Sequence, residues 1–375
     1  MHGSDEAPEN KTAAMVIGPI ESRKGNCMMV LRPIRHTDLE SLLAMAGQAG
    51  YGMTTLPPDK TLLQRRIEES MDAFVIHPEK PRGETYLFIL EDTATGRPAG
   101  VCGMVSKVGG FDPFFSYRIG GIPLVSPMLG LNKTMPVLEL TIMYDGPAIV
   151  GSLFLLPEYR KDGNGRLLSL ARFLFMAQFP QRFDPHVIAE MRGKIEADGR
   201  SPFWDAVGRH FFDIDFPRAD YLTMVDKKFI VELMPRHPIY IPLLGAAAQE
   251  AIGKVHPATQ PALKILQDEG FVFENMVDIF EAGAVVGCPR DQIRTVRESR
   301  VGKVRRIAEL PQDAQILGLS NTTLDFRACR AGVLVDGDGG VQIDSFSAKA
   351  LSVQAGDDIR YVTLRSGTVR GTDHG

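Results

Sequence analysis

The chain has 375 residues, of which 44% are hydrophobic and 23% are charged, and its formal net charge is −4. This composition is typical of a globular protein with a sizeable core, and the length predicts two domains or one large domain with an appendage. The mildly acidic balance argues against a nucleic-acid-binding protein, and no apolar run reaches the ~20 residues that a membrane-spanning helix needs.

Residues 1–27 are rich in Glu, Asn, Ser and Gly, lack periodicity, and are predicted to be a disordered extension. A β-α-α-β-β pattern follows, with a capping box of Thr37 and Glu40 at the start of its first helix. The predicted elements are a strand at 29–33, helices at 37–47 and 62–73, and strands at 86–91 and 98–105.

The middle of the chain begins with residues 109–131, which are rich in Gly, Pro and aromatic residues and predict an irregular excursion with short strands. The pattern then becomes regular again, with Ser201 as a helix cap and Pro202 at the first helical position. The predicted elements are strands at 151–156, 186–192 and 271–273 and helices at 167–179, 201–212 and 260–268.

From about Asn321 the pattern changes to short strand-like runs separated by turns. These runs, at 330–335, 341–344 and 359–365, predict a small C-terminal β-barrel or sheet. The fold class expected for the whole chain is therefore α+β, with a large domain over residues 28–318 and a small β domain over 319–375.

Residues 160–165 read R-x-x-G-x-G and lie between a predicted strand and a predicted helix. Glycines lack a Cβ, so the backbone N–H groups of such a turn can close on a phosphate, and the helix dipole adds partial positive charge there. The pattern indicates a diphosphate-bearing ligand. The alternative is a tight strand-to-helix turn that binds nothing.

An R-x-x-G-x-G turn after a strand resembles the pyrophosphate loop of the GNAT superfamily of acyl-CoA N-acyltransferases. Further segments, in order from 28 to 257, resemble the arginine N-succinyltransferase family, and the resemblance covers roughly residues 28–299. The matching segments are MMVLRPIR at 28–35, TTLPP at 54–58, YLFILEDT at 86–93, residues 159–173, AEMRG at 189–193, SPFW at 201–204, ELMPRHPIY at 232–240 and VHP at 255–257.

The resemblance implies a GNAT-like core with a mixed, mostly antiparallel sheet. It also implies a cytoplasmic acyltransferase of arginine catabolism, with succinyl-CoA as co-substrate, L-arginine as acceptor, and no metal or tightly bound cofactor. Four widely separated cysteines agree with a reducing compartment.

The same resemblance assigns roles to residues. His256 matches the proton donor of the family, and Leu153 matches a position that binds succinyl-CoA, plausibly through its main chain. Arg160, Gly163, Asn164 and Gly165 are expected to hold the CoA phosphates. The strand before this loop should diverge from its neighbour to admit the pantetheine arm. The candidates for binding the acceptor or the acyl carboxylate are Glu190, Arg192, Arg236 and His237.

Several alternatives remain open at this stage. His256 could act as an acid or as a base, and transfer is expected to be direct because no cysteine lies near the loop or His256 in sequence. Residues 143–150 are more apolar than the family pattern, which leaves ornithine or another amine as a possible acceptor. A non-catalytic CoA-binding subunit, in a homo- or hetero-oligomer, is the remaining alternative.

Overall fold

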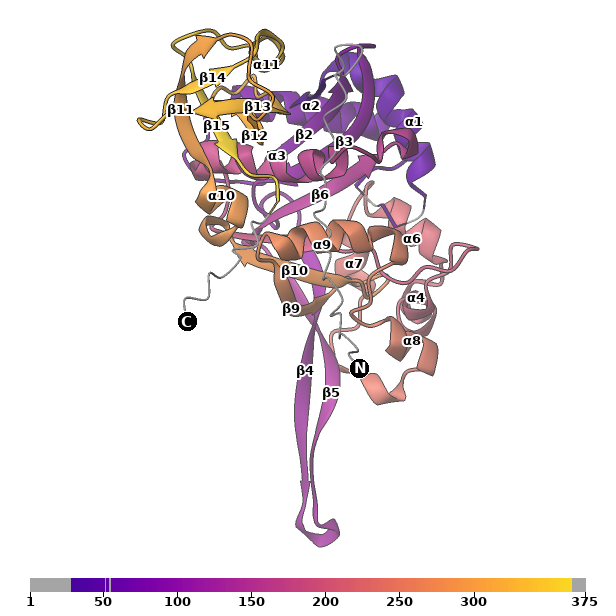
Figure 1. The fold of residues 1–375 in the computed structure, drawn as a ribbon. Helices are drawn as coiled ribbons and strands as arrows, with labels where there is room; N and C mark the ends of the chain where they lie inside the picture. The colour runs from indigo at the N-terminus through magenta and orange to yellow at the C-terminus, as the bar shows by residue number, and fades with distance from the viewer. Residues whose placement is uncertain (1–27, 51, 54, 366–375) are drawn as a thin grey trace, which may run out of the picture.

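The structure is a computed structural model that describes residues 28–50, 52, 53 and 55–365, so the predicted extension 1–27 lies outside the described residues. An α+β body carries a small β-barrel at one end and a long hairpin that projects from the other (Figure 1). The expected fold class is confirmed by this arrangement.

The core sheet begins with four antiparallel strands, and a fifth strand then pairs in parallel with the fourth. In spatial order these are β1 (Met29–Pro33), β2 (Thr85–Asp92), β3 (Arg97–Val105), β6 (Ala148–Leu155) and β7 (His186–Glu190). Beyond β7 the sheet continues through β10 (Ala284–Pro289) and β9 (Val272–Val277) into the projecting hairpin.

Alternation along the strands divides the core into two layers, because successive side chains point to opposite faces. Leu87 and Ile89 pack with helix α1 (Leu39–Ala49) and much of helix α2 (Lys60–Val75). Phe88 and Leu90 pack with helix α3 (Asn164–Gln178), which is the helix that follows the glycine-rich loop. The sheet therefore holds the start of α3 against the end of β6.

The predicted irregular excursion at 109–131 is wrong. The structure has two 13-residue strands, β4 (Phe114–Ser126) and β5 (Leu131–Met143), which pair along their whole length as a hairpin (Figure 1). Much of the hairpin extends away from the core, so Gly and Pro residues that would break a central strand are tolerated there.

The helix termini follow the sequence only in part. The Oγ of Ser201 accepts the N–H of Trp204, as predicted, but the predicted helix 201–212 is broken at Gly208, whose Cβ would lie 2.2 Å from the Trp204 ring. The predicted Thr37 cap is also wrong. Asp38 occupies the cap position of α1 and binds the buried Arg32 guanidinium with both oxygens.

Short elements cover the second half of the core. They are α4 (Pro202–Ala206), α5 (Arg209–Phe212), α6 (Phe216–Leu222), α7 (Lys228–Leu233), β8 (Ile239–Tyr240), α8 (Ala246–Ala251), α9 (Gln260–Asp268) and α10 (Arg294–Glu298).

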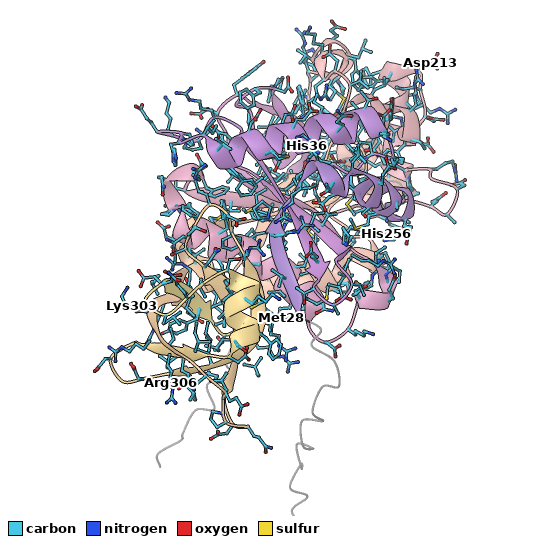
Figure 2. All side chains as sticks on the ribbon, turned by 90° about the horizontal axis from the view of Figure 1, so that it is seen from above. Met28, His36, Asp213, His256, Lys303 and Arg306 are labelled. Atoms are coloured by element: carbon cyan, nitrogen blue, oxygen red, sulfur yellow. The ribbon has the colours of Figure 1, made fainter. Side chains whose placement is uncertain are left out.

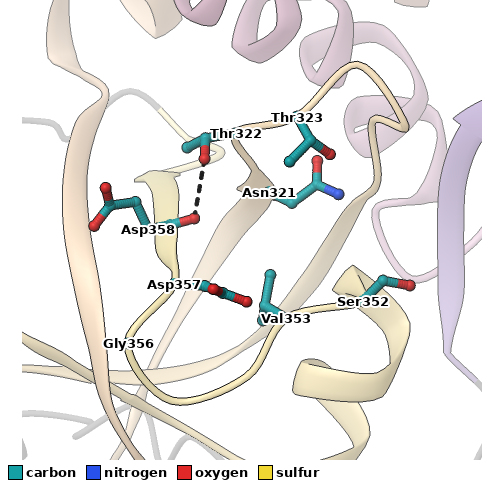
Figure 3. Close-up of a pocket in the computed structure, with 8 residues that line it drawn as sticks. All are labelled: Asn321, Thr322, Thr323, Ser352, Val353, Gly356, Asp357 and Asp358. Carbon is teal, nitrogen blue, oxygen red and sulfur yellow. Dashed lines mark hydrogen bonds between the residues drawn. The ribbon is translucent and has the colours of Figure 1, made fainter.

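The predicted C-terminal β unit is a closed barrel, because β12 and β13 pair with each other at the two ends of the order β12-β15-β11-β14-β13. Its elements are β11 (Arg300–Ile307), β12 (Gln315–Asn321), β13 (Ala328–Val335), β14 (Val341–Ile343), α11 (Ser345–Leu351) and β15 (Asp358–Val362). β11 joins the barrel upstream of the expected boundary at 319, and β13 also pairs with β1. A polar hollow on the barrel, between Asn321 and Asp358, contains none of the predicted site residues (Figure 3).

Candidate functional site

The glycine-rich loop connects β6 to α3. Gly163 is the cap residue of α3 and has φ +78°, a conformation in which a side chain would be strained. The Nε of Arg160 donates to the Leu155 carbonyl at 2.9 Å, and the Asn164 side chain donates to the Tyr159 carbonyl at 3.1 Å. The loop is therefore held in shape by its own side chains.

Four backbone N–H groups at the start of α3 have no acceptor in the described part of the chain; they belong to Asp162, Gly163, Gly165 and Arg166. The backbone N–H of Asn164 differs, because it donates to the Lys161 carbonyl at 3.0 Å. Asn164 thus stabilises the turn in this geometry, while the two glycines keep the free donors that an anion needs.

A residue that the sequence did not single out also reaches this loop. Arg330 is exposed on β13 of the barrel, and its Nη1 donates to the Asp162 carbonyl at 2.6 Å. The same Nη1 lies 3.6 Å from where a Cβ on Gly163 would be. The barrel therefore places a positive charge beside the free N–H groups. Since the contact spans 168 residues, no local sequence pattern could reveal it.

The strand before the loop diverges from its parallel neighbour, as expected. Registered pairs join β6 and β7 only at Ala148↔Val187 and Ile149↔Ile188, although both strands continue further. Beyond the last pair the backbone of β6 is open on that side, which leaves an edge where an extended ligand can pair.

A β-bulge interrupts β6 at the same level. Gly103 of β3 faces Gly151, but Val101 faces Phe154, so two residues of β6 lie opposite Cys102. One of the two, Ser152, has φ +50°, and the other is Leu153. The Leu153 side chain packs against the core, which agrees with the expectation that Leu153 would bind a ligand through its main chain.

His256 precedes helix α9. Its backbone N–H donates to the Arg192 carbonyl at 2.8 Å, and its Nδ1 accepts the N–H of Ala258 at 3.1 Å. When the ring is neutral, its proton is therefore on Nε2. Burial, together with the positive charge of Arg192, lowers the pKa of His256. His256 lies well away from the barrel residues Lys303 and Arg306 (Figure 2).

Three carboxyl groups are linked through Asp278, whose charge acts on both Glu190 and Glu281, and Glu281 also interacts with the charge of Arg192. Glu190 is the last residue of β7, and solvent reaches part of its side chain. The surrounding protein still desolvates its carboxyl group, and this burial, together with the negative charge of Asp278, raises the pKa of Glu190 to about 8. Burial also raises the pKa of Asp278, and burial together with the charge of Asp278 raises the pKa of Glu281 well above its usual range. Glu281 accepts the Gly193 N–H at 2.7 Å. We call Glu190, Asp278 and Glu281 the carboxylate cluster.

The sequence analysis named Glu190 and Arg192 as candidates and did not name Asp278 or Glu281. The latter two lie on the turn between β9 and β10, and the only available signal was their spacing in DIFE at 278–281. Arg192 is half-buried beside the carboxylate cluster, and its Nε has no hydrogen-bond partner among the described residues. Burial lowers the pKa of Arg192, while the charges of Glu281 and Asp220 oppose that shift.

The structure does not bring the other two acceptor candidates into this group. Arg236 and His237 are exposed between α7 and β8, and neither has a hydrogen bond or ion pair within the described residues. Their binding role stays a prediction. In the apolar segment 143–150, Met143 packs with Ile149 against Ile188, so this segment lies toward the start of β7, whereas Glu190 is at its end.

The register between β6 and β7 relates the position of the bulge in β6 to the position of Glu190 in β7. If the register of the Ile149↔Ile188 pair is continued past the point where the strands diverge, Glu190 falls opposite Gly151, at the beginning of the bulge. The bulge and Glu190, the first member of the carboxylate cluster, therefore lie on the two strands that flank the opening, and the free N–H groups lie on the loop that follows β6. A glycine-rich loop at a helix start, beside two diverging strands, is the arrangement that the sequence predicted for a protein that binds an acyl-CoA.

Comparison with known proteins identifies the family. The family model described as arginine N-succinyltransferase beta subunit matches residues 29–295, and that of its C-terminal domain matches residues 300–363. The chain belongs to the arginine N-succinyltransferase family and is thus an acyltransferase.

Individual relatives agree with this assignment. The chain is 40% identical over 343 residues to arginine N-succinyltransferase of Salmonella schwarzengrund (strain CVM19633), which covers 90% of this chain and 98% of that protein. The same values hold for the enzyme of Salmonella agona (strain SL483). The solved arginine/ornithine succinyltransferase subunit AI from Pseudomonas aeruginosa is 32% identical, with a TM-score of 0.83 over 91% of this chain and 100% of that one. Among the described residues, no helix is both long and apolar enough to span a membrane.

Proposed function

We propose that this protein transfers the succinyl group of succinyl-CoA to the α-amine of L-arginine in arginine catabolism. The observation that carries the proposal is the alignment of the bulge in β6 with the carboxylate cluster at the end of β7. One side suits a CoA thioester, and the other suits a cationic acceptor.

The CoA thioester has three points of attachment on its side of the opening. The free N–H groups of Gly163 and Gly165 suit the pyrophosphate, with Arg160 and Arg330 as neighbouring cations. The open edge of β6 suits the amide-containing pantetheine arm. The main chain of Leu153, in the bulge, is the donor proposed for the thioester oxygen.

The acceptor side supplies complementary charges. Glu190 and Asp278 lie close enough for their charges to interact, and two carboxylates suit the planar fork of a guanidinium. Arg192, with its unpaired Nε, suits a carboxylate of either the acceptor or the succinyl group. The fork geometry favours arginine over ornithine, whose ammonium is a compact point charge.

Transfer is proposed to be direct. The amine nitrogen attacks the thioester carbonyl carbon, the oxyanion collapses, the C–S bond breaks, and the CoA thiolate takes up a proton while the amine loses one. Because Nδ1 of His256 accepts from Ala258, the neutral ring presents Nε2–H as a hydrogen-bond donor to the departing thiolate, and transfer of a proton to the sulfur would use the imidazolium form of His256. Cys102 lies beside the bulge, but it is fully buried, and burial raises its pKa to about 12, which opposes an acyl-cysteine route.

Two alternative functions are kept beside arginine succinylation. An enzyme that prefers ornithine agrees with the name of the Pseudomonas relative, and a CoA-binding subunit of a hetero-oligomer agrees with its description as a subunit. The intact loop and His256 weigh against a purely structural subunit. The buried free thiols of Cys102, Cys288 and Cys329 support the cytoplasm as its location.

One assay separates these functions. Purified full-length protein is given succinyl-CoA and a panel of amines, and thiol release is followed. Release that depends on arginine supports the proposal, and preferential release with ornithine supports the sibling activity. CoA binding without release in the presence of any amine would contradict catalysis by this chain.

The barrel arginine gives a prediction about CoA affinity. We expect Arg330→Ala to raise the KM for succinyl-CoA by about 3- to 5-fold at low salt, since one exposed charge contact is lost, and to leave kcat unchanged. The difference should shrink as salt screens the contact. Arg306→Ala is the matched control, because Arg306 is an exposed barrel arginine on β11. Equal KM values for the two variants would remove Arg330 from the CoA site.

The pKa of Glu190 gives a prediction about pH. With a pKa of about 8, this carboxyl is mostly neutral at pH 7 and ionised at pH 9, so it attracts a guanidinium better at the higher pH. Argininic acid, which has a hydroxyl in place of the α-amine, should inhibit more strongly at pH 9 than at pH 7. The pH dependence should weaken in Glu190→Gln, in which Asp278 and Glu281 remain, and should persist in Glu250→Gln, which changes an exposed carboxylate on α8. An unchanged pH dependence in Glu190→Gln would assign it to another group.

A further inference from the structure

Arg172 is a buried cation that the mechanism above does not use. It lies on α3 beneath β6, and only 2% of its surface is exposed. Its Nε and Nη2 donate to the carbonyl and the Oγ of Ser169, both at 3.0 Å. No carboxylate pairs with it in the part of the chain that the structure describes. Burying a charge without a counter-charge costs free energy of folding, so the presence of Arg172 at this position calls for an explanation.

The neighbouring titratable group does not neutralise this charge. Cys102 is fully buried, and burial raises its pKa to about 12 even though the charge of Arg172 acts in the opposite direction. Its thiol is therefore neutral near pH 7. Burial lowers the pKa of Arg172, but an arginine side chain keeps its proton in proteins.

The remaining contacts of Arg172 are at the bulge. Its Nη1 donates to the carbonyls of Gly103 at 3.4 Å and Gly151 at 3.3 Å. These two glycines face each other in the last regular pair before the register shifts. The next residue, Ser152, has φ +50°, a conformation that persists only where its surroundings hold it. A Cβ on Gly151 would meet nothing within 4 Å, so β6 has free space on one side here.

We propose that Arg172 is a positioning residue for acyl transfer, which holds the bulge of β6 so that the main chain of Leu153 is aimed at the thioester carbonyl. Its unneutralised charge, close behind the same strand, also favours the oxyanion that forms when the amine adds to the carbonyl carbon. The inference rests on the proposed function. It extends the site to a residue that touches neither substrate.

The test uses the full-length chain and the variants Arg172→Met and Arg172→Lys. In the absence of an acceptor amine, infrared spectroscopy measures the thioester carbonyl stretch of bound succinyl-CoA, which falls in frequency when the carbonyl is polarised. We expect a shift in the wild type that is largely lost in Arg172→Met and partly kept in Arg172→Lys. With the amine present, kcat should fall by about 10²-fold in Arg172→Met, the range for loss of oxyanion stabilisation, while CoA affinity measured by calorimetry changes little.

Leu170→Ala is the control for damage to the core, since Leu170 is equally buried on the same helix. It should lower the melting temperature without moving the carbonyl stretch. An unshifted carbonyl in the wild type, or equal shifts in Arg172→Met and the wild type, would overturn the inference. If Arg172→Met does not fold, wild-type kcat and carbonyl stretch in Arg172→Lys would overturn it. A shift that is present in the wild type and lost in Arg172→Met, without transfer to any amine, would refute the proposed function and leave the role of Arg172 in polarising the carbonyl supported.

Discussion

Replacing His256 with alanine is expected to lower kcat by about 10²-fold or more, the usual contribution of a positioned proton donor or acceptor. CoA affinity should be unchanged, because the free N–H groups at Gly163 and Gly165 belong to a different segment. Steady-state thiol release and calorimetry with CoA measure the two quantities separately.

A second substitution tests whether the loss of turnover comes from the loss of the imidazole or from damage to the turn at His256. His256→Asn keeps a side-chain acceptor for the Ala258 N–H but lacks the imidazole, so it should be as stable as the wild type and as slow as His256→Ala. His210→Ala, at an exposed position on α5, should have no effect. If His256→Asn keeps wild-type turnover, the imidazole has no part in the chemistry and His256 only caps a turn.

Replacing Asp278 with asparagine is expected to raise the KM for arginine by about 10- to 100-fold, the value of a charge-assisted hydrogen bond in a partly buried site. One oxygen of Asp278 accepts the N–H groups of Phe280 and Glu281 at 2.7 and 2.8 Å. Asparagine can keep those two bonds with its carbonyl oxygen, so the turn should survive while the charge is lost. The KM for succinyl-CoA should change little.

The control for this prediction is Asp338→Asn, which removes an exposed carboxylate from the distant barrel turn and should leave both KM values unchanged. A KM for arginine that is unaffected by Asp278→Asn would mean that the guanidinium binds elsewhere. Arg236 and His237, the two candidates outside the carboxylate cluster, would then mark the next surface to test.

Much of the core could be predicted from sequence because its signals are local. The strand at Met29–Pro33 and the helix at Gln260–Asp268 match their predicted limits, since alternation and helical periodicity depend only on neighbouring residues. The hairpin β4–β5 was not predicted, because its strands lack such a regular local pattern. Its strands project from the core, so burial does not select a regular apolar pattern in them.

The sequence by itself determined the glycine-rich loop, the strand and helix that flank it, and the candidacy of His256, because each is written in a few consecutive residues. Only the tertiary structure decided what surrounds them. The pairing of β6 with β7 places Glu190 across from the bulge, and the turn after β9 places Asp278 and Glu281 close to one another. The closed barrel places Arg330 in contact with the loop. These contacts join segments that lie far apart along the chain, and packing, which no local pattern encodes, fixes their distances.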